Sequence, residues 1–78
     1  MTETLEPSPR AWAIAAGLVR SGRATNATAM DGFIRLLARG GVRYWVPFDG
    51  DRLLRGETLE DADELQLGFV DAMMRAGA

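Results

Sequence analysis

Residues 42–55, VRYWVPFDGDRLLR, decide the fold that this sequence predicts. Over residues 42–48 the side chains alternate between two faces, one of which carries Val, Tyr, Val and Phe. This alternation of β-branched and aromatic residues is typical of a strand. Asp49 and Gly50 form a strong hairpin-turn signal, and residues 52–55 are long enough for a short return strand. The stretch therefore predicts a β-hairpin.

The residues before this hairpin predict two helices. The first covers residues 8–21. Ser8 can cap its free N–H groups, and Pro9 suits the first helical position, where a missing N–H costs nothing. Gly22 fits the left-handed stop that commonly ends a helix. The second helix covers residues 28–39, where apolar side chains recur at i, i+3, i+4 and i+7 and so share one face.

Two pairs of residues have the spacing of a capping box, in which a Thr and an acidic residue three positions later bond each other's backbone N–H. Thr28 and Asp31 would open the second helix in this way. Thr58 and Asp61 would open a third helix, which is expected to run to about Gly77. Acidic residues crowd its first turns, where the helix dipole favours negative charge.

The predicted fold class is therefore α+β, with the element order α-α-β-β-α and one β-hairpin packed against three helices. A lone hairpin is marginal in water, so helices must cover one of its faces. Residues 1–7 are expected to form a flexible N-terminal tail, and residues 8–78 a single compact α+β domain. The predicted core contains Phe33, Leu37, Tyr44, Val46, Leu65 and Phe69.

Composition argues against most enzyme chemistry. The 78 residues include no Cys and no His, which removes thiolate metal sites, disulfides, the Cys nucleophile and the usual general base near neutral pH. We therefore expect no enzyme, no cofactor and no metal. The absence of disulfides indicates a cytoplasmic protein. The apolar run over residues 11–19 is far shorter than the roughly 20 residues that span a membrane, so no membrane segment is expected.

The predicted last helix offers the first candidate surface for a partner. Helix capping explains the acidic residues of its first turn but not Asp71, which lies beyond the useful range of the dipole. A charged row gives association rate and specificity, while an apolar border gives affinity. The simpler alternative is a face that is only solvated. The candidate partner-binding residues are Glu60, Asp61, Glu64, Leu67, Asp71 and Met74.

The outer face of the hairpin is the second candidate surface. A two-residue turn would set Leu54 opposite Trp45, whereas a three-residue turn would set Arg55 there. In both cases Trp45 shares its face with leucine and arginine, and Trp and Arg dominate the hot spots of interfaces. The alternative is that the first helix covers this face. The residues of this second surface are Arg43, Trp45, Arg52 and Arg55.

Two resemblances extend these expectations. The helix–hairpin–helix order over residues 28–77 resembles that of small phage head-completion proteins, which implies a structural part of a virion. In its size, acidic balance and lack of catalytic residues, the chain is similar to phage-encoded anti-CRISPR inhibitors. That second resemblance implies a protein that occludes a larger complex that handles nucleic acid.

The leading functional hypothesis is therefore a small non-enzymatic inhibitor or adaptor that binds a protein partner as a monomer or small homodimer. The alternatives are the virion part and a winged-helix regulator whose second helix would place Arg35 and Arg39 in the major groove of DNA. A sequence pI near 4.9 and the absence of Lys give a weak basic footprint, so direct nucleic-acid binding is not expected.

Overall fold

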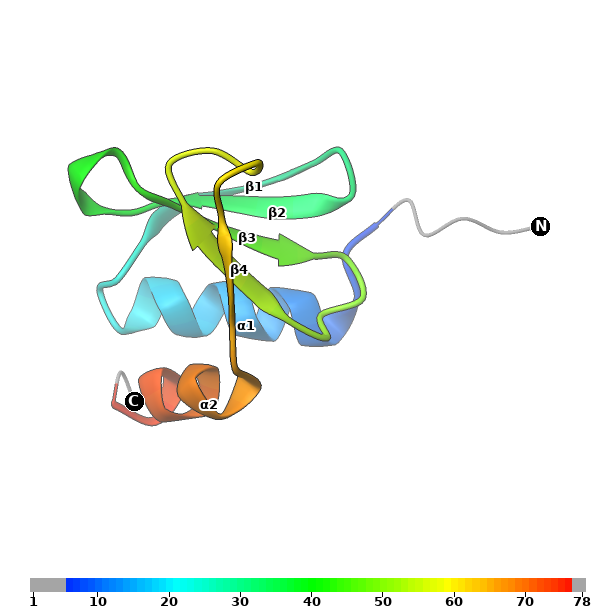
Figure 1. Cartoon of the computed structure of the whole chain (residues 1–78). Helices are drawn as coiled ribbons and strands as arrows, with labels where there is room; N and C mark the ends of the chain where they lie inside the picture. The colour runs from blue at the N-terminus through cyan, green and yellow to red at the C-terminus, as the bar shows by residue number, and fades with distance from the viewer. Residues whose placement is uncertain (1–5, 77–78) are drawn as a thin grey trace.

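The computed structural model describes residues 6–76 and contains two helices and one five-stranded antiparallel sheet. The strands follow one another across the sheet in chain order, and both helices lie on the same side of it (Figure 1). The chain is α+β, but the predicted arrangement of three helices around one hairpin is wrong. Most of the predicted tail at residues 1–7 lies outside the described residues, as do residues 77–78.

The elements are α1 (Pro9–Arg20), β1 (Thr25–Met30), β2 (Phe33–Leu37), a 3-10 turn η1 (Arg39–Gly41), β3 (Arg43–Pro47), β4 (Leu53–Gly56), β5 (Asp63–Leu65) and α2 (Leu67–Ala76).

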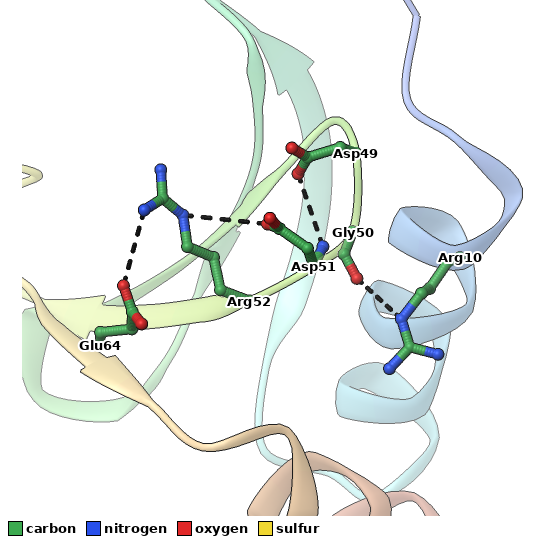
Figure 2. A network of polar contacts seen from close by, with 6 residues as sticks. All are labelled: Arg10, Asp49, Gly50, Asp51, Arg52 and Glu64. Atoms are coloured by element: carbon green, nitrogen blue, oxygen red, sulfur yellow. Dashed lines mark hydrogen bonds and ion pairs between the residues drawn. The ribbon is translucent and has the colours of Figure 1, made fainter.

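The first helix forms where its termini predict it. The Ser8 hydroxyl accepts a hydrogen bond from the backbone N–H of Ala11 at 3.1 Å, and Pro9 occupies the first position. The N-terminus of α1 is also tied to the loop between β3 and β4. The backbone N–H of Ser8 donates to the Phe48 carbonyl at 2.7 Å, and Arg10 Nε donates to the Gly50 carbonyl at 2.8 Å (Figure 2).

The predicted second helix is wrong, because residues 28–39 form most of a β-hairpin instead. Asp31 and Gly32 have φ angles of 51° and 83°. Positive φ at both central residues defines a type I′ turn, whose twist matches that of paired strands. Thr28 bonds the Asn26 carbonyl and caps no helix. Ile34 is buried on the face of the sheet that the helices cover, while the other three residues of the predicted apolar stripe, Met30, Phe33 and Leu37, lie on the opposite face.

The predicted hairpin is confirmed. β3 pairs with β4 in the register that sets Leu54 opposite Trp45, which is the two-residue-turn alternative. β2 pairs along the other side of β3, with Ile34 opposite Val46. The hairpin is therefore the centre of a larger sheet, with β3 as its middle strand.

The predicted third helix, capped by Thr58, begins eight residues too early, because α2 starts at Leu67 and not at Leu59. The reciprocal bonds of the capping box are present: the Thr58 N–H donates to Asp61 Oδ1 at 2.8 Å, and the Asp61 N–H donates to Thr58 Oγ1 at 3.3 Å. They close the turn between β4 and β5 instead of starting a helix. β5 then pairs with β4, with Leu65 opposite Leu53, and α2 starts only at Leu67. The same hydrogen bonds serve a turn here because the next residues pair with a strand.

The core lies between the sheet and the two helices. Of the predicted core residues, Tyr44 and Val46 are buried, and Leu65 is partly buried and packs against the core. Phe69 is 48% exposed, so its predicted burial is wrong. Phe33 and Leu37 are half-buried on the opposite face of the sheet, so they do not belong to this core either. The buried apolar residues are Ala11, Ile14, Ala15, Leu18, Ala24, Ile34, Leu36, Tyr44, Val46, Phe48, Leu53, Val70 and Met73.

Candidate functional site

The face of the sheet turned away from the helices is the most distinctive surface of the protein; we call it the outer face. Both helices lie on the other side of the sheet (Figure 1). No helix among residues 6–76 covers the outer face, so its central side chains are only half-buried. Strand alternation and pairing assign to it Thr28, Met30, Phe33, Arg35, Leu37, Arg43, Trp45, Pro47, Leu54 and Glu64, and Arg52 joins this face through its ion pair with Glu64.

Trp45 lies at the centre of the outer face. It is paired with Arg35 of β2 on one side and with Leu54 of β4 on the other, and Leu54 is paired in turn with Glu64 of β5. The indole N–H of Trp45 is buried by its surroundings and has no acceptor within the described part of the chain. Buried polar groups nearly always have a hydrogen-bond partner, so this donor is an exception that marks the centre of the face.

The outer face is basic on a protein that is acidic as a whole. Arg43 donates through Nη1 to the Glu57 carbonyl at 2.8 Å, which holds its side chain but leaves its charge uncompensated. Arg52 pairs with Glu64 at 3.5 Å (Figure 2). Arg35 forms no ion pair with any residue in the range 6–76. Three arginines thus border the apolar centre, and only Arg52 among them forms ion pairs within residues 6–76, with Glu64 and, at 4.0 Å, with Asp51, although the whole chain carries a net charge of −2.

The structure brings together three of the four residues of the second predicted surface. Arg43, Trp45 and Arg52 belong to the outer face. Arg55 lies on the opposite side of β4, paired with Tyr44, and its guanidinium carbon is 5.9 Å from the centroid of that ring. The alternative that the first helix covers Trp45 is wrong, because α1 packs on the face that carries Tyr44.

Sequence reasoning missed the part of the outer face that β1 and β2 contribute. The sequence predicts a helix for Met30, Phe33, Arg35 and Leu37, which would place the three apolar residues on its buried face and Arg35 on a different face. The signal that could have placed them is the Asp31–Gly32 pair, which is the same kind of turn signal that correctly predicted the hairpin.

The residues of the first predicted surface do not share one helix face, because the helix that would have aligned them does not start at Thr58. Two of them, Glu60 and Asp61, lie in the turn between β4 and β5, and Glu64 lies on β5. The other residues of this set, Leu67, Asp71 and Met74, lie on α2, where Asp71 is exposed and Met74 is half-buried against the core.

The described residues contain little that suggests acid–base or metal chemistry. Within residues 6–76, no group of three or more His, Cys, Asp or Glu side chains is placed to hold a metal ion. A hydrogen bond with the Asp49 side chain raises the pKa of Asp51 above its ordinary value of 3.8. Both carboxyls belong to an exposed turn, where solvent reaches them freely (Figure 2). The helices of the described part are too short or too polar to cross a membrane.

Comparison with known proteins gives no relative: no family model, no curated protein and no solved structure matches this chain. The fold defines the chain as a five-stranded antiparallel meander with two helices on one face. Its surfaces are therefore the features that bear on function.

Proposed function

We propose that this protein is a non-catalytic binding module that docks a partner protein on the outer face of its sheet. The observation that carries this proposal is the composition of that face: a central Trp, apolar neighbours and arginines, with no helix of the described part of the chain over them. Aromatic residues, Met and Arg are enriched in interfaces, and binding energy is concentrated in central Trp, Tyr and Arg residues.

The chemistry of the face favours a partner surface with apolar side chains bordered by carboxylates. Phe33 and Leu54 offer apolar area beside Trp45. The guanidinium groups of Arg35 and Arg43 can each bind a carboxylate through two parallel hydrogen bonds. Charge complementarity of this kind steers the encounter, while the desolvated centre holds the complex. An inhibitor or adaptor that occludes part of a larger complex would use such a face.

A single-stranded nucleic acid is the second class of ligand that an aromatic and basic sheet face can bind, through base stacking and phosphate contacts. The protein partner is favoured by the net charge of −2 and by the aliphatic side chains that surround Trp45. The winged-helix hypothesis requires Arg35 and Arg39 on one recognition helix, but Arg35 lies on a strand and Arg39 in a 3-10 turn. The virion hypothesis rests on a helix–hairpin–helix order, which is absent from the described residues.

The experiment is differential capture from a lysate with four immobilised proteins. The wild type and a Trp12→Ala control, which alters an exposed Trp on α1, are expected to retain the same partner protein. Trp45→Ala and Arg35→Glu are expected to lose it. Arg35→Glu reverses a half-buried charge with no ion pair among the described residues, so it tests the face even if Trp45→Ala lowers stability. Unfolding in urea verifies that each variant is folded.

Two results would contradict the proposal. The first is equal capture by the wild type and both outer-face variants, which would place the interface elsewhere. The second is saturable, salt-dependent quenching of Trp45 fluorescence by a homopolymeric oligonucleotide, measured in the Trp12→Phe background. That result would indicate that the ligand of the outer face is a single-stranded nucleic acid and not a protein.

A further inference from the structure

We infer that a hollow at the opposite side of the sheet from the outer face is a binding site for the phosphate group of a small phosphorylated molecule. The hollow has a volume of about 330 Å³ and lies where the C-terminus of α1, the 3-10 turn η1 and strands β3 and β4 meet. Three arginines line it together with Tyr44 and Ser21: Arg23, Arg39 and Arg55. We call it the arginine hollow.

The arginines of the hollow make no ion-pair contact among the described residues, although Arg55 also lines an adjoining hollow with Glu57, Asp61 and Asp63. None of the three arginines forms an ion pair within residues 6–76, and no carboxylate lines the hollow. Asp63 is paired with Arg55 between β4 and β5, yet the two side chains form no ion pair. The Arg55 guanidinium instead lies over the ring of Tyr44, at 5.9 Å from its centroid. All three arginines are exposed, so water and salt screen their mutual repulsion, and an anion between them would offset the repulsion that is left.

The simple structural alternative is that these arginines serve the C-terminus of α1, where cations are favoured. The hydrogen bonds of that terminus do not support it. Its last carbonyls accept from backbone N–H groups: Ser21 N bonds the Gly17 carbonyl, Gly22 N bonds Val19, and both Arg23 N and Ala24 N bond Leu18. The Ser21 hydroxyl also donates to the Leu18 carbonyl. No guanidinium group takes part, so the three arginines are free to bind something else.

A phosphate group fits this arrangement best. Guanidinium groups bind phosphate oxygens through paired, charge-assisted hydrogen bonds, and several arginines can share one dianion. The buried Tyr44, only 5% exposed, forms a wall of the hollow and orients Arg55. A second hollow of about 300 Å³ shares Arg23 and Arg39 and continues past Thr25. It provides space for the rest of a phosphorylated molecule.

The test is a titration of the full chain with inorganic phosphate and, separately, with glycerol phosphate. The NMR signals of the backbone amides and of the arginine Nε groups monitor binding. Saturable shifts at Gly22, Ala38, Arg39 and Arg55, with millimolar or tighter affinity, are expected. Arg39→Gln should weaken binding at least about tenfold, since it removes charge-assisted hydrogen bonds. The matched control is Arg52→Gln on the outer face, which should bind as the wild type does. Arg39→Lys, which keeps the charge but loses the fork, should bind more weakly than the wild type.

The two probes distinguish the sources of the phosphate group. Tighter binding of glycerol phosphate identifies a phosphate ester whose remainder occupies the adjoining hollow; equal binding identifies free phosphate. The inference is overturned if no saturable binding occurs, if chloride at equal ionic strength reproduces the shifts, or if Arg39→Gln and Arg52→Gln weaken binding equally. This site does not depend on the outer face, so its failure would leave the proposed protein-binding function standing.

Discussion

Gly17 of α1 and Met74 of α2 are in direct contact: a Cβ atom at position 17 would lie 2.3 Å from Cγ of Met74 and 3.3 Å from its Cβ. The absence of a side chain at Gly17 is therefore what allows the two helices to approach each other. Met74 belongs to the sequence-predicted partner surface, and this contact gives it a packing role.

Gly17→Ala is expected to destabilise the protein although alanine favours helices. Overpacking costs about 1–3 kcal/mol, and the gain in helix propensity returns at most about 1 kcal/mol. We expect a net loss of about 1–2 kcal/mol in the free energy of unfolding in urea. Gly68→Ala is the matched control, because a Cβ at Gly68 of α2 meets nothing within 4 Å. It should be neutral or stabilising. In a Met74→Ala background the penalty of Gly17→Ala should disappear; an unchanged penalty would contradict the contact.

Gly50→Ala is expected to be more damaging, because the neighbour of this residue is backbone. Gly50 has a φ of 69°, and a Cβ there would lie 2.6 Å from the backbone nitrogen of Ala11. Left-handed strain and overpacking together should cost about 2–5 kcal/mol. Gly22→Ala is the control, since its φ is 77° but the surrounding space is open. Equal losses for the two variants in thermal or urea unfolding would show that α1 is not docked on this turn.

Asp31 offers a test of the β1–β2 hairpin. Its φ of 51° is tolerated by Asp and Asn but strained for a β-branched side chain. Asp31→Asn should change stability by less than about 0.5 kcal/mol, whereas Asp31→Val should cost about 1–2 kcal/mol. Urea unfolding measures both. If Asp31→Val were neutral, the left-handed turn would be in doubt.

The pKa of the Asp51 carboxyl should lie above 3.8, mainly because of its hydrogen bond with the Asp49 side chain and to a smaller extent because of the charge of Asp49. A carboxyl ¹³C NMR titration measures it, and Asp49→Ala should lower it. Because the pKa is raised in the folded state, the group contributes stability at pH below its unfolded value and loses it as the pH rises through the folded value. Asp51→Asn should therefore be slightly more stable than the wild type at neutral pH, and the difference should vanish in acid. A wild-type pKa at or below 3.8 would contradict the interaction.

Local rules predicted the elements whose ends are fixed by neighbouring residues. The cap at Ser8 and the stop at Gly22 defined α1 because they act within one helical turn. The Asp49–Gly50 signal and the alternation before it defined the β3–β4 hairpin and the outward orientation of Trp45. About half of the outer face followed from these two results.

Tertiary pairing decided the elements that the sequence misplaced. β2 carries apolar side chains on both faces and Arg35 as its one polar residue, and so short and mostly apolar a run cannot be distinguished from a buried helix by its period. Thr58 and Asp61 make the same hydrogen bonds in a turn as in a helix cap, so their spacing could not identify the element that follows. The arginine hollow could not be predicted from the sequence for a related reason. Arg23, Arg39 and Arg55 come to line one hollow only after four separate elements pack together.

The anchoring of α1 has a consequence for biosynthesis. The helix is translated before the sheet and α2, yet its N-terminus is held by Phe48 and Gly50, and its apolar side is completed by Val70 and Met73. A helix of 12 residues is marginal in water by itself. Its apolar side must therefore stay uncovered on the ribosome until the whole sheet and α2 have emerged. During that interval α1 is the segment most open to chaperones, and variants that weaken its docking should lower the yield of folded protein more than its final stability suggests.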